Sequence, residues 1–563
     1  MSQEENKEQI NELFIKAEEE EHNYNWSGAI NYLKKAEKIS LDKKILEGEV
    51  YYKLGEIFQI NADYERILEN VLKNFEFSIS YFQKAHKKYE ELNNIAKKNA
   101  SLGFINLLKY ISGTEDGIEE TLLESSRNCF KIASQHYLKN GNLIESLKIR
   151  ILECRALELL IGEKIIRLDV HTDSLKLILE CEELIKKIWG EIKNQPNLPE
   201  IYFYNFLNSI LEYYIWLVAY FSADRLTISQ YIIDHLNRLG KIIDYLEKSE
   251  KTLSLFVAYS ISAIFHLIFA IYHVNNQFEQ KKYIKLAQKW LKKADPLLPE
   301  INSNPSLSLF YYSRFNIAIR LISLGYFSKD IRTILEDLNL CIKLLNISFP
   351  RIIVAHFTLY TAGIYIIGSF NPYLPDNQRI NMVKRAQNLI ESATNEISVV
   401  GNPSYKIFNL ELDYFECTIN AMLGDLIKEN KEKSNYFLIA FKIFDDFSDY
   451  SHQNLNHTQI YSQFLNSLSR VGNTLAKNSL DKSKKIKYYE KAINVQLKSK
   501  KMLINVDYIG NLFLIGNTYY KLGILTDDDK TLKNSYLAYV DAIEYCNNRG
   551  YFNLVGSAYV NLA

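Results

Sequence analysis

One helical pattern recurs along this chain and constrains its fold more than any other feature. A small residue is followed four positions later by a large apolar residue and seven positions later by alanine, most clearly in residues 29–36, 78–85, 126–133 and 535–542. Positions i, i+4 and i+7 share one face of an α-helix, so each copy predicts a helix that buries this face. Copies near both ends of the chain predict a structure built from repeated helices.

A complementary pattern marks the helix that precedes such a copy. Here a glycine is followed three residues later by a large apolar residue, as in Gly55 with Phe58, Gly472 with Leu475, Gly516 with Tyr519 and Gly556 with Tyr559. Glycine lets two antiparallel helices approach closely, and we expect the apolar residue one turn later to fill the space beside it. The two patterns together predict helical hairpins.

The positions of helix-breaking residues and the spacing of apolar residues predict where each hairpin begins. The chain shows no strand-like region, and all nine prolines fall in predicted connections or first helical turns, where a missing N–H does least harm. We expect hairpins to open near Glu5, Lys44, Ala96, Asn142, Pro199, Thr252, Pro305, Pro350, Pro403, Asn456, Ile504 and Gly550. From Pro199 onward the starts lie roughly 45–54 residues apart, within the range of helical repeats.

The middle of the chain is more apolar than its ends. The segments Thr252–Phe278 and Ile352–Pro375 contain no Asp, Glu, Lys or Arg, and Ile201–Ala223 contains only Glu212. Their length would permit membrane spans, but they carry polar residues that are costly in lipid, so we expect buried helices of a large helical body. We therefore predict three regions: N-terminal hairpins in 1–195, divergent apolar hairpins in 196–402, and C-terminal hairpins in 403–563.

The segment 514–523, with Gly516, Asn517 and Tyr519, resembles the first helix of tetratricopeptide repeats (TPRs), especially those of kinesin light chains and spindle-orientation adaptors. The match is good for about six hairpins, whereas in 161–345 only hairpin length and apolar pattern support it. The resemblance implies an all-α, right-handed superhelical solenoid of antiparallel hairpins. It also implies that the first helices line a concave groove that binds partner proteins.

Composition excludes several classes of function. Lys+Arg and Asp+Glu both total 67, so the formal net charge of +0 argues against nucleic acid as a partner. The polar, acidic N-terminus lacks the features of a secretory signal, and the six cysteines are too far apart for a Cys-x-x-Cys pair. We expect a cytoplasmic protein without a cofactor.

Motifs for catalysis and metal binding are also missing. Phosphate-binding loops, a nucleophile elbow and a His-Glu-x-x-His zinc site do not occur, and His266 and His273 are too far apart along a helix to share one metal ion. These residues therefore predict no enzyme and no metal site. The densest basic stretch, from Lys482 to Lys501, is expected on a solvated outer helix, with an acidic partner or anionic surface as the alternative.

The resemblance places the residue after each signature small residue inside the groove. Near the C-terminus these are Asn473 and Asn517, each followed four residues later by a lysine, Lys477 and Lys521. An amide can pair with the backbone of an extended peptide, and a lysine can add contact with a carboxylate. We predict a peptide-binding site at these four residues.

At the N-terminal end the equivalent positions carry carboxylates. Glu18 follows Ala17 and Glu56 follows Gly55, with Glu21 close by, so this part of the groove is expected to be acidic. Solvated glutamates near helix starts are the alternative interpretation.

The leading hypothesis is a non-enzymatic scaffold or adaptor that binds an extended peptide segment. One alternative is the sensor portion of a larger effector enzyme, a protease or signalling protein, that continues beyond Ala563. A membrane-trafficking adaptor is the third. The segment Phe552–Ala563 is expected to form a helix without a second helix to cover it, so a continuation, a partner or self-association through this end would complete it.

Overall fold

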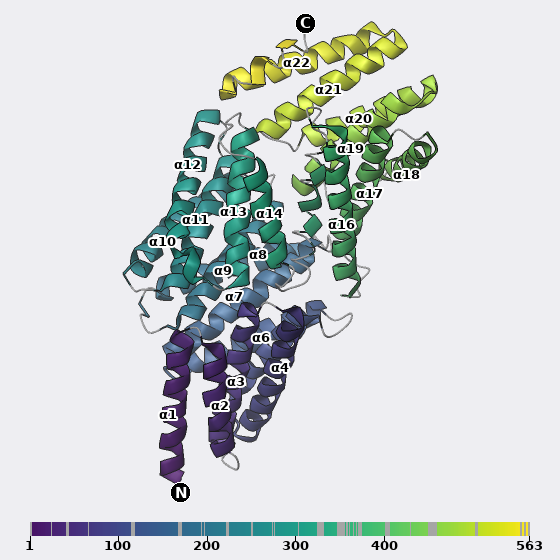
Figure 1. The fold of residues 1–563 in the computed structure, drawn as a ribbon. Coiled ribbons are helices and arrows are strands. Elements are labelled where there is room, and N and C mark those ends of the chain that lie inside the picture. The colour runs from purple at the N-terminus through teal and green to yellow at the C-terminus, as the bar shows by residue number, and fades with distance from the viewer. Residues whose placement is uncertain are drawn as a thin grey trace.

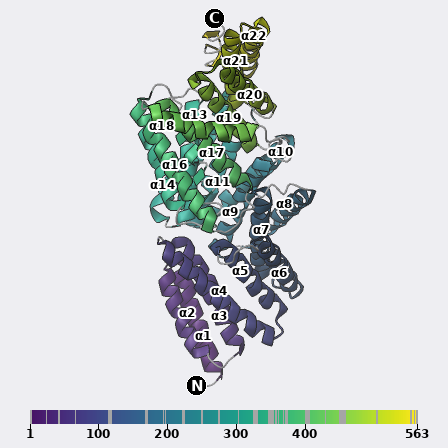
Figure 2. The same ribbon diagram turned by 90° about the vertical axis from the view of Figure 1, so that its right-hand side faces the viewer.

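The computed structural model describes residues 3–23, 25–40, 44–65, 67–113, 119–166, 172–192, 194–195, 198–220, 225–248, 251–272, 274, 276–301, 303–323, 331–345, 355, 358–359, 361–363, 365–366, 369, 374–399, 406–427, 430–448, 459–501, 505–551, 554–556 and 559–560. Throughout this part of the chain every regular element is helical, and the helices pack as sequential antiparallel pairs. Figures 1 and 2 show the chain rising from α1 at one end of the molecule to α22 at the other.

The odd-numbered helices are the first helices of the hairpins. They are α1 (Gln3–His22), α3 (Lys44–Tyr64), α5 (Ile95–Ser112), α7 (Leu143–Ile166), α9 (Glu200–Tyr220), α11 (Thr252–Tyr272), α13 (Asn304–Ser323), α17 (Lys406–Leu426), α19 (Gln459–Asn478) and α21 (Asn505–Thr526). Each begins within one helical turn of a start that the sequence predicted. The all-α hairpin architecture and its register are therefore confirmed.

The even-numbered helices are the second helices of the hairpins. They are α2 (Trp26–Ser40), α4 (Leu68–Glu91), α6 (Glu119–Lys139), α8 (Thr172–Ile192), α10 (Arg225–Leu246), α12 (Gln277–Ala294), α14 (Ile331–Leu345), α16 (Asp376–Val399), α18 (Asn430–Ser448), α20 (Lys482–Lys500) and α22 (Asp529–Arg549). A short 3-10 helix, η1 (Asp295–Glu300), follows α12 and contains Pro299. The predicted start near Pro350 lies outside the described residues.

Three hairpins are joined by the same set of contacts. The second-helix aromatic lies so close to the first-helix glycine that an added Cβ would be 2.9 Å from the ring at Gly55, 2.6 Å at Gly103 and 2.7 Å at Gly516. The rings belong to Phe82, Phe130 and Tyr539. The serine four residues before each ring donates a hydrogen bond to the glycine carbonyl: Ser78 to Gly55 (2.6 Å), Ser126 to Gly103 (2.8 Å) and Ser535 to Gly516 (2.7 Å).

This arrangement adds one detail to the sequence interpretation. The ring packed directly on Gly55 comes from the facing helix, and Phe58, one turn after the glycine, packs against Phe77 and Tyr81 of that same helix. The reason is geometric, because a ring on the opposite helix reaches the bare backbone face across the helix pair. Where the small residue of the recurring pattern is Ser78, Ser126 or Ser535, its hydroxyl also bonds the glycine carbonyl.

The solenoid coils tightly enough for successive turns to touch. Helices α3 and α13, α7 and α17, and α9 and α19 are in contact, and each pair is ten labels apart. The ring of Phe278, at the start of α12, lies 3.3 Å from the Cβ position of Gly550, which follows α22. Contacts at a constant separation indicate that one superhelical turn takes about five hairpins.

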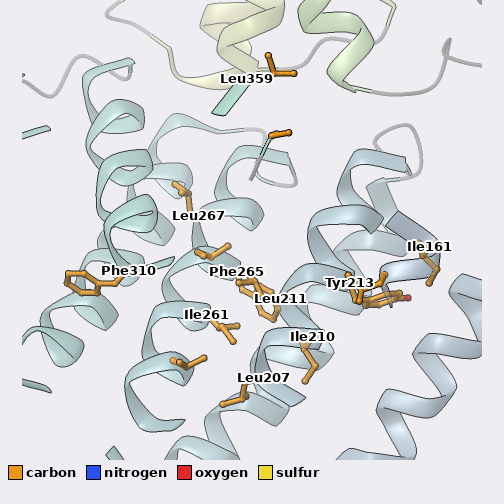
Figure 3. Close-up of a cluster of buried hydrophobic side chains, with 14 of the residues drawn as sticks. Ile161, Leu207, Ile210, Leu211, Tyr213, Ile261, Phe265, Leu267, Phe310 and Leu359 are labelled. Atoms are coloured by element: carbon orange, nitrogen blue, oxygen red, sulfur yellow. The ribbon is translucent and has the colours of Figure 1, made fainter. Parts of the chain in front are cut away.

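The central first helix α11 is largely buried. Its segment Thr252–Ile271 is the one helix among the described residues that is long and apolar enough to cross a membrane, and 72% of that window is buried inside the protein. It contacts α9, α10, α12 and α13. Figure 3 shows Ile261 and Phe265 from α11 near Leu207 and Leu211 from α9. The surrounding helices thus cover an apolar surface that the sequence expected to be buried.

Buried apolar side chains form two clusters. A small one joins the first hairpins through residues such as Ile10, Trp26 and Val50. The large one runs from Tyr52 to Tyr551. This cluster continues across both predicted region boundaries, at 195/196 and 402/403. The division of the chain into three regions stays a prediction.

Candidate peptide-binding surface

The four residues predicted to bind a peptide lie on two neighbouring first helices. Asn473 and Lys477 belong to α19, and Asn517 and Lys521 belong to α21. Helix α19 contacts α21 on one side and α17 on the other. The solenoid therefore places equivalent positions of the repeats next to one another, as the hairpin register requires.

Asn473 is held within the protein. Its Nδ2 donates to Thr518 Oγ1 on α21 (2.9 Å) and to the Ser469 carbonyl (3.1 Å). The Thr518 hydroxyl also accepts a hydrogen bond from Gln496 Nε2 on α20 (3.1 Å). This small polar network joins three helices, so Asn473 contributes to the contact between repeats.

Asn517 has a different environment. Its side chain is half-buried, and no hydrogen bond joins it to any residue in the described part of the chain. The amide keeps its donors and its acceptor available for another molecule. The two asparagines are equivalent in sequence pattern, but only Asn473 has an internal partner among the described residues.

The two lysines also differ. Lys477 Nζ lies 3.3 Å from Asp425 Oδ1 on α17, and Asp425 also accepts a hydrogen bond from Asn478 (3.1 Å). The Lys521 residue as a whole is exposed, although its ammonium lies against the protein, and it has no carboxylate partner among the described residues. Burial of its ammonium against the protein, followed by repulsion from Lys477, lowers the pKa of Lys521. Lys477 is thus compensated by Asp425, whereas the charge of Lys521 has no carboxylate partner in the part of the chain that the structure describes.

The predicted acidic surface lies on α1 and α3, but it also contains cations. Lys53 Nζ lies 3.2 Å from Glu18 Oε1. Burial alone would lower the pKa of Lys53, but the carboxylates of Glu56, Glu21 and Glu18 outweigh burial and raise it. This part of the first turn is a network of mixed charge.

Helix α9 closes the same network from across the superhelix. The hydroxyl of Tyr202, which is buried, donates to Glu56 Oε1 (2.8 Å). Lys148 of α7 lies 5.4 Å from the centre of the Tyr202 ring. Burial raises the pKa of Glu56, although Lys53 and Lys148 partly oppose the rise. The Tyr202 contact could not be predicted from a local pattern, because 146 residues separate the two partners.

Other titratable groups lie in the core. All six cysteines are buried, and burial raises the pKa of the Cys341 thiol to about 12 and that of Cys546 to about 11. Within the described ranges, no group of three or more His, Cys, Asp or Glu side chains is arranged to hold a metal ion. On α19 and α21, the Asn517 amide can form hydrogen bonds and the Lys521 ammonium provides positive charge.

No protein-family model and no curated protein sequence matches this chain. Solved structures are similar to it in architecture only. A monomeric mutant of IFIT1 with m7Gppp-AAAA is 13% identical, with a TM-score of 0.39, over 87% of this chain and 90% of that chain. The Naa15/Naa10 structure bound to HypK-THB is 11% identical, with a TM-score of 0.21, over 99% of this chain and 95% of that chain.

A circular tandem repeat protein with a novel repeat topology is also 11% identical, with a TM-score of 0.24, over 91% of this chain and 97% of that chain. The helical repeat architecture of this chain rests on its own helices, which pack as sequential antiparallel pairs. At these identities the likeness concerns the fold alone.

Proposed function

We propose that this protein is a cytoplasmic, non-enzymatic interaction scaffold of the TPR type, and that α19 and α21 bind an extended segment of a partner protein. The free amide of Asn517 beside Lys521 carries the proposal. Amide side chains that pair with a peptide backbone bind extended segments with little regard to sequence. The lysines then favour a segment that carries a carboxylate.

Each of the four residues has its own role in this proposal. Asn517 pairs with the peptide backbone, and Lys521 attracts a carboxylate. Lys477 adds a second positive charge, which Asp425 partly compensates. Asn473 supports the surface by tying α19 to α21 through Thr518.

The acidic residues of α1 and α3 stand outside this binding surface. Glu18 and Glu56 already have partners in Lys53 and Tyr202. A partner that used them would first have to break these contacts. The C-terminal surface is therefore the one that we assign to peptide binding.

Selection from a displayed library of random peptides against the full chain tests the proposal. We expect the selected peptides to be extended and enriched in Asp and Glu. In isothermal titration, Asn517→Ala should weaken binding by about 1–3 kcal/mol, since two hydrogen bonds are lost. Lys521→Ala should weaken it less, and the loss should shrink as salt is added.

Matched controls lie on α20. Asn494→Ala and Lys498→Ala make the same substitutions at exposed positions of an outer helix and should leave the affinity unchanged. If Asn517→Ala binds the selected peptides as tightly as the wild-type chain, the proposed surface is wrong.

A further inference from the structure

The exposed face of α12 carries an uninterrupted row of lysines headed by an aromatic residue. Phe278, Lys282, Lys285, Lys289 and Lys292 follow one another at steps of four, three, four and three residues, which places them on one side of the helix. All five are exposed, and 62% of the Phe278 surface remains accessible. The helix contains six lysines and a single acidic residue, Glu279.

These lysines differ from a neighbouring lysine of the same helix. Lys293, on the adjacent side of α12, forms an ion pair with Glu247 (2.9 Å). Lys282, Lys285, Lys289 and Lys292 form no ion pair with any residue that the structure describes. Four uncompensated ammonium groups in about 15 Å of helix create a strong local positive potential in a chain of zero net charge.

The first helix of the same chain presents the complementary row. Glu8, Glu12, Ile15 and Glu19 lie on one side of α1 at steps of four, three and four residues. All four are exposed, with Ile15 at 56%, and the three carboxylates form no ion pair in the described part of the chain. Helix α1 contains eight glutamates and two lysines.

The two rows match in spacing as well as in charge. If the helices run antiparallel with Ile15 opposite Phe278, Glu12 lies opposite Lys282 and Glu8 lies opposite Lys285. From the apolar residue to the second charge is seven residues on both helices, about 10 Å. An apolar contact thus lies beside two ion pairs, the arrangement by which flanking charges set the partner and orientation of packed helices.

We propose that α1 of one molecule docks on α12 of a second copy of this chain. Figure 1 shows α1 at the N-terminal end and α12 beside α11 in the upper part of the molecule, so the contact joins different copies. The surface on one copy differs from that on the other, so the contact is heterologous and association continues beyond a dimer. Exposed ion pairs are individually weak, so the assembly forms only at high protein concentration and low salt.

Sedimentation velocity of the full chain tests this contact. At about 50 mM salt the average mass should rise between about 10 and 200 µM protein, and at about 500 mM salt the rise should disappear. Glu8→Lys with Glu12→Lys, and separately Lys282→Glu with Lys285→Glu, should each weaken association at least about tenfold, because each places like charges opposite one another.

Combining all four reversals in one chain should restore association, since the pairs are attractive again. Lys484→Glu with Lys498→Glu provides the matched control, because it reverses two exposed lysines on α20 and should change nothing. A wild-type chain that stays monomeric throughout, or a fourfold variant that stays monomeric, overturns the proposal. Binding of a monomeric wild-type chain to phosphatidylserine vesicles through Lys282 and Lys285 would assign the row to a lipid surface and also overturn it.

Discussion

The two ends of the solenoid carry polar residues at equivalent positions of their first helices, but they use them differently. In the first turn, α9 lies across from α3, and Tyr202 and Lys53 satisfy the carboxylates of Glu56 and Glu18. On α21, Asn517 and Lys521 lack such partners among the described residues. The same repeat pattern thus produces a closed polar network at one end and an available surface at the other. The difference is that Tyr202 of α9 reaches Glu56, whereas no described helix supplies a partner to Asn517.

The largest expected effect is on the free energy of unfolding, and it tests whether the same ring–glycine contacts stabilise the hairpins near both ends of the solenoid. Phe130→Ala and Tyr539→Ala remove the rings that cover Gly103 and Gly516, and each should lower the free energy of unfolding by about 3–5 kcal/mol. Denaturant titration of the full chain measures the loss. Gly190→Ala is the control, because nothing lies within 4 Å of its added Cβ. If either ring proves dispensable, the two ends do not share one scaffold.

The pH dependence of stability should separate the N-terminal half from the C-terminal half. Burial raises the pKa of Glu153 on α7 from its ordinary 4.5 to about 7, although Lys131, Arg127 and Arg150 oppose the rise. A raised carboxyl pKa means that the folded state favours the protonated form. The resulting stability is fully present below about pH 4.5 and is lost as the pH rises through about 7.

Glu153→Gln keeps this position neutral at every pH. The variant should therefore exceed the wild-type chain in stability by roughly 1–3 kcal/mol at pH 8 and match it near pH 4.5. Thermal unfolding at the two pH values, with hydrogen exchange to localise the change to α6–α8, checks this. An equal difference at both pH values would show that Glu153 does not titrate as described.

Thr518→Val tests the internal role of Asn473. The substitution removes the hydroxyl that joins the half-buried Asn473 to the buried Gln496, so both amides lose a partner and the free energy of unfolding should fall by about 1–2 kcal/mol. Chemical denaturation measures the change. Asn517→Ala should change stability by less than about 0.5 kcal/mol, since its amide has no hydrogen-bond partner among the residues that the structure describes. Equal losses in the two variants would remove the distinction between Asn473 and Asn517.

The smallest expected effect on stability comes from the hydrogen bond between Tyr202 of α9 and Glu56 of α3. Tyr202→Phe removes one hydrogen bond to Glu56 and should cost about 1 kcal/mol. Amide exchange should quicken in α3 and α9 and stay unchanged in α19 and α21. Tyr520→Phe, at an exposed position of α21, is the control. Unchanged exchange in α3 would show that the Tyr202 contact does not hold this network closed.

Much of the fold could be predicted from the sequence because each helical hairpin depends on the spacing of residues that are close together in the chain. The spacing from Ser126 to Phe130 and Ala133 defines a buried helix face, and prolines define the connections. The partners of Glu56 and Asn473 could not be predicted in the same way. They depend on small rotations between successive hairpins that add up over the chain, and a pattern within one hairpin does not record that sum.

Hydrogen exchange of the full chain with and without a selected acidic peptide tests most directly which end binds a partner. The open surface of α19 and α21 predicts slower exchange in these two helices and no change in α1, α3 and α9. The protection should be lost in Asn517→Ala and kept in Asn494→Ala. Protection confined to α1, α3 and α9 would contradict the assignment and would place binding at the network that Tyr202 and Lys53 now occupy.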